Sequence, residues 1–100
     1  MSKNREYFAL KAFSNSMYPK IEDGDMLIVR KQPSFENGET GIAIVNGNDK
    51  TIKKIKIDET GIILIPLNMI DFEPIFYSCE KAKSLPVQIV GRVEEVRKTL

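Results

Sequence analysis

Short apolar runs separated by turn residues extend along the whole 100-residue chain, and this pattern limits the possible folds more than any other feature. No stretch keeps the 3.6-residue period of an amphipathic helix, whereas runs such as Met26–Arg30 and residues 42–45 have the length of strands. Asn46-Gly47 separates the second of these runs from residues 50–57, which predicts a β-hairpin. The pattern therefore predicts one all-β domain of about seven short strands.

The other expected strands follow the same rule. Three further runs have the length of strands, at residues 7–13, 62–65 and 87–96. Two longer segments lack such a pattern, and we expect residues 33–41 to form a polar loop and residues 67–84 to be irregular. A chain of this length can bury a single core without disulfides or metals.

Charge and cysteine content exclude several classes of protein. The 15 basic and 14 acidic residues give a net charge of +1, which provides no general attraction to nucleic acid or to an anionic membrane. No run approaches the length of a membrane span, and no hydrophobic signal core follows the polar N-terminus. The single cysteine, Cys79, cannot form an internal disulfide, and without a neighbouring histidine we interpret it as an ordinary free thiol. We expect a soluble, cytoplasmic domain with no metal and no cofactor.

The chain contains no histidine, which excludes a Ser-His-Asp hydrolase. A serine nucleophile would need another base, and lysine is the plausible one. Side chains alternate between the two faces of the strand expected at residues 50–57, so one face would carry Thr51, Lys53, Ile55 and Ile57. This face is the more apolar, so it should be the core side, with Lys54 and Lys56 pointing to water.

Lys53 is therefore the lysine with a chemical reason to be neutral. An exposed lysine has a pKa of about 10.4 and cannot act as a base at neutral pH. Burial disfavours the ammonium form and lowers the pKa, so a half-buried Lys53 could accept a proton from a serine. The alternative is that Lys53 lies at a strand end and extends its ammonium group to the surface.

Ser16 is the candidate nucleophile. It follows an expected strand and precedes Pro19, which cannot continue that strand. A serine at such a junction can expose its hydroxyl and leave neighbouring backbone N–H groups free to form an oxyanion hole. The alternative is a turn serine that bonds to its own backbone, and Ser14 is a competing hydroxyl.

Several short motifs occur in a fixed order around these two residues. They are Ser16-Met17-Tyr18-Pro19, Gly24-Asp25, Ile52-Lys53-Lys54, Leu64-Ile65-Pro66-Leu67-Asn68, Phe72-Glu73-Pro74-Ile75 and Ile89-Val90-Gly91-Arg92-Val93. This series resembles the C-terminal domain of the LexA-like repressors, the S24 family of serine peptidases, which also includes phage repressors of the lambda type and UmuD. Each motif is weak alone, but their order is specific, and the resemblance extends from about Tyr7 to Val96.

The resemblance implies a fold and a set of roles. The fold would be a single domain of short, strongly bent strands and hairpins, as in LexA and signal peptidases. Ser16 matches the nucleophile and Lys53 the general base, and the backbone N–H groups of Ser16 and Met17 would lie near the oxyanion. The family cleaves its own chain at an Ala-Gly or Cys-Gly bond, which separates a DNA-binding head from a dimerising tail. The RecA filament stimulates this cleavage, and we expect a homodimer that pairs through residues 87–96.

The chain departs from the family pattern at the cleavage site. No glycine follows an alanine or a cysteine, because the residues that precede the six glycines are Asp23, Asn37, Thr40, Asn46, Thr60 and Val90. Only about 15 residues precede Ser16, so we expect the helix-turn-helix and the cleavage-site region to lie outside residues 1–100. The domain would then act on a substrate supplied in trans, or serve for dimerisation. The alternatives are a signal peptidase, a non-catalytic interaction module and a UmuD-like stand-alone protein.

Overall fold

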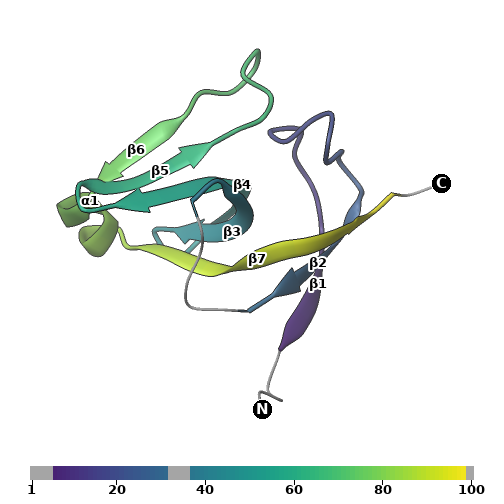
Figure 1. Ribbon diagram of the computed structural model, residues 1–100, viewed down its shortest axis with the longest axis horizontal. Coiled ribbons are helices and arrows are strands. Elements are labelled where there is room, and N and C mark those ends of the chain that lie inside the picture. The colour runs from purple at the N-terminus through teal and green to yellow at the C-terminus, as the bar shows by residue number, and fades with distance from the viewer. Residues whose placement is uncertain (1–5, 32–36, 99–100) are drawn as a thin grey trace.

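The fold is a bent antiparallel sheet, seen in a computed structural model that describes residues 6–31 and 37–98 (Figure 1). The described residues form seven strands and one short helix: β1 (Tyr7–Lys11), β2 (Met26–Arg30), β3 (Glu39–Val45), β4 (Asp49–Asp58), β5 (Gly61–Ile65), β6 (Ile75–Ser78), α1 (Cys79–Ser84) and β7 (Val87–Arg97). The strands lie in the order β1-β2-β7-β3-β4-β5-β6. The prediction of an all-β domain with about seven strands is confirmed.

The long strand β7 joins the two parts of the sheet. Its residues 92–97 pair with β2, and its residues 87–92 pair with β3. Both pairings contain a shift of register, which bends a strand and increases its twist. Figure 1 shows β7 crossing the molecule, with β1 and β2 beside one part of it and β3 to β6 beside the other. In this way β7 fixes the position of the β1–β2 connection relative to β4.

Two small cores lie on different parts of the bent sheet. The buried residues of the first core are Ala12, Met17, Ile21, Leu27, Val29, Ile42 and Ile52. The buried residues of the second core are Ala43, Ile55 and Leu64. Strand β4 contributes to both cores, so both of its faces are partly covered.

The expectation that only one face of β4 points to a core is wrong in part. Ile52, expected on the solvent face, is 6% exposed, whereas Ile57, expected on the core face, is 41% exposed. The bend of the sheet brings the residues after β1 against the Ile52 side and leaves the far end of β4 uncovered. Strict alternation assumes a flat sheet with one buried face, and this sheet does not meet that condition.

The expected hairpin is present, and two expected loops are partly structured. Asn46 and Gly47 both have positive φ angles, of 57° and 75°, in the turn between β3 and β4. The segment expected to be irregular contains β6 and α1, and the Ser78 hydroxyl caps the helix by accepting a hydrogen bond from the Lys81 N–H, 3.2 Å away. The helix has only six residues, too few to show a helical period. The end of the expected loop at residues 33–41 belongs to β3, and residues 33–36 lie outside the described residues.

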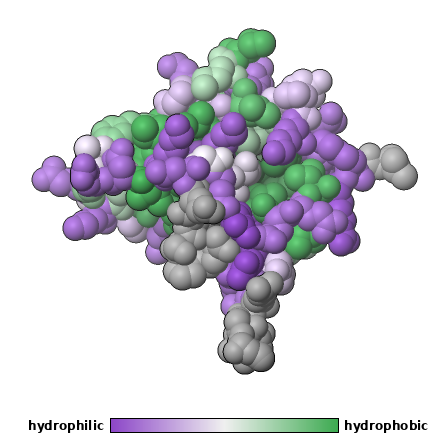
Figure 2. Space-filling model, in the orientation of Figure 1, coloured by the Kyte–Doolittle hydropathy of each residue, from purple (hydrophilic) through white to green (hydrophobic). Residues whose placement is uncertain are grey.

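The outer surface is mixed in character. Figure 2 shows hydrophilic and hydrophobic side chains interspersed on one face, with hydrophobic atoms at the tip of the β5–β6 connection. That tip carries Met69, which is 56% exposed, and Ile70, which is 94% exposed. Within the described ranges no helix has the length and apolar character needed to cross a membrane.

Candidate active site

Ser16 lies in the connection between β1 and β2, and the chain folds tightly around it. It is 2% exposed, and its carbonyl oxygen accepts hydrogen bonds from the N–H groups of Leu67 and Asn68, both at 2.9 Å. A turn follows, in which the Tyr18 N–H donates to the Asn15 carbonyl oxygen over 3.1 Å. The backbone of the serine is therefore held by the segment that follows β5.

Lys53 lies on β4 and reaches the serine from the other side. Its amine nitrogen Nζ is 3.2 Å from the Ser16 Oγ, and it also donates a short hydrogen bond to the Thr51 Oγ1. Thr51 and Lys53 are two residues apart on one strand, so their side chains project from the same face. The Ser16 hydroxyl donates to the Ile52 carbonyl oxygen over 3.2 Å. The structure thus brings together the predicted serine and the predicted lysine, which 37 residues separate in the sequence.

The surroundings of Lys53 favour its neutral form. Burial lowers the pKa of Lys53 below the ordinary lysine value. No carboxylate forms an ion pair with this amine anywhere in residues 6–31 and 37–98. The amine lies over the ring of Phe72, with 5.9 Å between the ring centroid and Nζ. A lysine with these neighbours can accept the proton of Ser16, once the hydroxyl turns from the Ile52 carbonyl toward Nζ.

The two backbone N–H groups that were predicted to bind an oxyanion, those of Ser16 and Met17, differ in whether they already donate a hydrogen bond. The Ser16 N–H donates to the Ser14 Oγ over 3.1 Å, so Ser14 supports the backbone of the serine. The Met17 N–H donates to no group in the described part of the chain, while the Met17 side chain is buried in the first core. Met17 therefore presents one backbone N–H beside the serine that a developing oxyanion could use.

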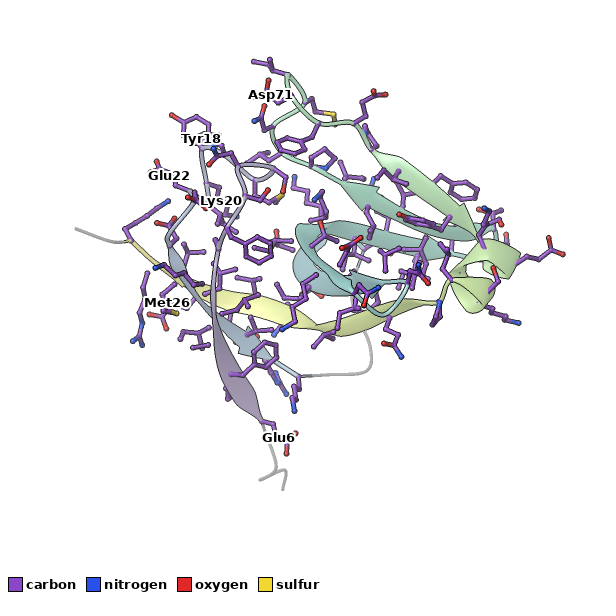
Figure 3. All side chains as sticks on the ribbon, turned by 180° about the vertical axis from the view of Figure 1, so that it is seen from behind. Glu6, Tyr18, Lys20, Glu22, Met26 and Asp71 are labelled. Carbon is purple, nitrogen blue, oxygen red and sulfur yellow. The ribbon has the colours of Figure 1, made fainter. Side chains whose placement is uncertain are left out.

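An open cavity of about 390 Å³ adjoins the serine segment. Its lining residues are Asn15, Tyr18, Glu22, Asp23, Asn68 and Asp71. Figure 3 shows Tyr18 and Asp71 at the same end of the molecule, on the β1–β2 and β5–β6 connections respectively. Both connections thus line this cavity, and Asn15, the residue before Ser16, is one of the lining residues.

Other candidates from the sequence lie elsewhere. Lys54 lines a different cavity with Glu39 and Arg92, and Arg92 forms ion pairs with Glu39 and Glu94. Cys79 is an exposed free thiol at the start of α1, and its Sγ is 3.1 Å from the Glu59 carbonyl oxygen. No group of acidic or thiol side chains able to hold a metal ion occurs among the described residues.

Sequence reasoning did not assign roles to Thr51, Asn68 and Phe72. Thr51 could have been found, because a hydroxyl two residues before a lysine on a strand lies beside it on the same face. Asn68 belongs to one of the ordered motifs, but its contact with Ser16 joins residues far apart in the sequence. The proximity of Phe72 to Lys53 depends on the path of the β5–β6 connection, for which the sequence has no local signal.

A serine hydroxyl within hydrogen-bond distance of a half-buried lysine amine is the geometry that a Ser-Lys dyad requires. The chain belongs to the peptidase S24-like family, whose model matches residues 1–94. The resemblance seen in the ordered motifs is confirmed.

The chain is similar to several LexA repressors. It is 41% identical to the LexA repressor of Petrotoga mobilis over 68 residues, which cover 66% of this chain and 33% of that protein. It is 38% identical to the LexA repressor of Oleidesulfovibrio alaskensis over 86 residues, which cover 85% of this chain and 41% of that protein. It is 32% identical to an uncharacterized HTH-type transcriptional regulator of Haemophilus influenzae over 89 residues, which cover 89% of this chain and 36% of that protein. The matched segments thus span less than half the length of each of these relatives.

Proposed function

We propose that this chain is the autopeptidase and dimerisation domain of a LexA-like repressor, with Ser16 as nucleophile and Lys53 as general base. The observation that carries the proposal is the distance of 3.2 Å between the Lys53 Nζ and the Ser16 Oγ. The lowered pKa of Lys53, caused by burial, supports it, because a base must be neutral before it can accept a proton. The similarity to LexA repressors supports the assignment to a repressor.

The proposed reaction begins when neutral Lys53 accepts the hydroxyl proton of Ser16. The serine oxygen then bonds to the carbonyl carbon of the scissile peptide, and the Met17 N–H donates to the oxyanion. The Lys53 ammonium gives its proton to the leaving amine as the peptide C–N bond breaks, which leaves an acyl-enzyme. Lys53 next accepts a proton from a water molecule, and the resulting hydroxide bonds to the acyl carbon. The bond between this carbon and the Ser16 Oγ then breaks, and the Lys53 ammonium returns its proton to Oγ, which restores the serine and the neutral lysine.

The scissile bond lies outside residues 1–100 in this proposal. An Ala-Gly or Cys-Gly bond, the kind cleaved in the family, is not found in the sequence. The substrate is therefore a segment joined to this domain elsewhere in a longer polypeptide, or one supplied in trans. The cavity lined by Asn68 and by Asn15 and Tyr18, which are close to the serine in the chain, provides space for part of such a segment.

A peptide that contains one Ala-Gly bond tests the proposal directly. Wild-type chain and the Ser16→Ala and Lys53→Ala variants are incubated with the peptide, and the products are identified by mass spectrometry. A fluorophosphonate probe, which forms a bond to activated serines, serves as a second readout through the mass of the intact protein. We expect labelling at Ser16 in the wild type and in neither variant. Equal labelling of Lys53→Ala and wild type would disprove the dyad.

A second candidate function is a dimerisation module in which the dyad takes no part in chemistry. The pairing of β7 favours this function. Residues 93–97 of this strand pair with β2 along one edge, and within the described part of the chain no strand pairs with them along the other edge. A second copy could add its own β7 at the other edge. Sedimentation equilibrium would show a dimer that Ser16→Ala and Lys53→Ala leave intact, and a monomer at high concentration would exclude this interface.

A further inference from the structure

The β5–β6 connection, residues 66–74, forms one wall of the site and is fixed to the nucleophile at its start. Its first residue, Pro66, is fully buried, and the next two donate their N–H groups to the Ser16 carbonyl oxygen. The Asn68 side chain also donates to the Asn15 carbonyl oxygen over 3.1 Å. Three hydrogen bonds near one end therefore hold this connection against the serine segment.

The same asparagine turns the connection back toward β4. The Asn68 Oδ1 accepts hydrogen bonds from the N–H groups of Ile70, at 3.2 Å, and Asp71, at 3.4 Å. The next residue is Phe72, which is half-buried and whose ring centroid lies 5.9 Å from the Lys53 Nζ. The position of the ring thus follows from contacts that begin at Ser16.

The ring could affect Lys53 in two opposite ways. Attraction between an ammonium group and an aromatic face would favour the charged form, but 5.9 Å is close to the limit of about 6 Å for that attraction. Exclusion of water by the ring would favour the neutral form. Burial lowers the pKa of Lys53, and this direction agrees with exclusion of water rather than with attraction.

Charged side chains on the neighbouring segments do not explain the state of Lys53. Asp25 forms an ion pair with Lys98, and Glu39 forms one with Arg92. Asp71 accepts a hydrogen bond from Asn68. The remaining carboxylates on the segments packed around the site, Glu22, Asp23 and Glu73, are exposed, and none of them forms an ion pair with Lys53.

We propose that Phe72 is a positioning residue whose ring closes the solvent side of the Lys53 amine and so keeps Lys53 neutral and facing Ser16. This inference rests on the proposed function for its catalytic meaning. The effect of the ring on the protonation of Lys53 does not depend on the reaction, so a titration of Lys53 without any substrate can test it.

The first test follows the protonation of Lys53 by NMR. The whole chain is labelled with lysine carrying ¹³C at Cε, and Lys53→Arg assigns the signal. We expect Phe72→Ala to raise the titration midpoint of Lys53, because water reaches the amine. Phe72→Leu should keep the midpoint close to that of the wild type, because leucine still excludes water. Ile70→Ala, a change at an exposed residue of the same connection, is the matched control and should have no effect.

Two results of this titration would overturn the proposal. One is an unchanged Lys53 midpoint in Phe72→Ala, and the other is a lower midpoint in both Phe72→Ala and Phe72→Leu, as loss of an attraction would produce. If Phe72→Ala does not fold, Phe72→Val provides the same comparison with a smaller loss of packing, and an unchanged midpoint there also overturns the proposal.

The second test measures the rate of fluorophosphonate labelling at Ser16 against pH. Phe72→Ala should move the rising part of the profile to higher pH, with about tenfold slower labelling below the midpoint for each pH unit of displacement, and should keep the plateau at high pH. A lower plateau without displacement would indicate a merely structural ring and would overturn the proposal. Absence of labelling in the wild type at every pH would disprove the proposed function, and the NMR titration would then still decide the role of Phe72.

Discussion

The Lys53 amine lies 3.2 Å from the Ser16 hydroxyl oxygen although the two residues come from opposite parts of a bent sheet. Ser16 follows β1 and Lys53 lies on β4, and β7 is the strand that links these parts. Burial at this place lowers the pKa of Lys53. The fold thus provides the proximity that a Ser-Lys reaction needs and an environment that disfavours the charged form of the lysine.

The first prediction concerns the pH dependence of Ser16 reactivity. Neutral Lys53 is the reactive form, so labelling of Ser16 by a fluorophosphonate should become faster as pH rises and then reach a plateau. Because burial lowers the pKa of Lys53, the midpoint should lie below the ordinary lysine value of about 10.4. Lys53→Ala should reduce the plateau rate by about 10²–10⁴-fold. A wild-type rate that does not change with pH would contradict the role of Lys53.

The second prediction concerns Thr51, whose hydroxyl is hydrogen-bonded to the Lys53 amine. Thr51→Val keeps the shape of the side chain but removes this partner, so the amine loses part of its orientation toward Ser16. A hydrogen bond contributes about 0.5–1.5 kcal/mol, and we expect a loss of up to about tenfold in the plateau rate of labelling. Thr51→Ser should restore most of the rate. Equal rates for Thr51→Val and wild type would show that Thr51 does not position the amine.

The sequence pointed to the two residues of the proposed dyad more readily than to the residues around them. Ser16 and Lys53 stand next to recognisable local signals: a turn with Pro19 and an alternating strand. Phe72 and Asn68 act through contacts with residues far away in the chain, and no local pattern reports such contacts. For the same reason the strands with clear apolar runs were predicted, whereas β6 and α1, which are short and largely exposed, were not.

The burial of β4 shows a second limit of local reasoning. Alternation placed Lys53 on a core side correctly, since Ile55 on the same face is fully buried. It failed for Ile52 and Ile57, because the bend of the sheet changes which face is covered along a single strand. Such a bend results from β7 and its shifted registers, which hydrophobic periodicity does not encode.

The third prediction concerns Gly91, at the point where β7 passes close to β2. A Cβ atom at this position would lie 2.6 Å from the Arg30 carbonyl oxygen and 2.7 Å from the Val29 Cγ1. The backbone oxygen cannot move without disturbing the strand pairing, so Gly91→Ala should lower the free energy of unfolding by about 1–3 kcal/mol. Urea denaturation measures this loss, with Gln88→Ala, an exposed position on β7, as the control. Equal stability of the two variants would contradict the close approach.

The last prediction concerns the effect of Lys53 on stability. Burial lowers the pKa of folded Lys53, so between this pKa and the unfolded value of about 10.4 the unfolded chain binds more protons than the folded chain. The free energy of unfolding contributed by Lys53 therefore rises with pH through that window. Methionine carries no proton and avoids the cost of burying a charge, so Lys53→Met should be more stable than wild type on the acidic side of the window.

The difference in free energy of unfolding between Lys53→Met and wild type should shrink as pH rises through the window. The reason is that wild-type Lys53 becomes neutral in both the folded and the unfolded chain. Urea denaturation of the two chains at matched pH values measures it. Lys53→Arg is the control, since arginine stays charged throughout, and its stability should fall further below that of the wild type as pH rises. Parallel stability profiles for all three chains would show that Lys53 carries no penalty for burial. The expected result would mean that the lysine is retained at a cost in stability, as is common for residues that serve a reaction.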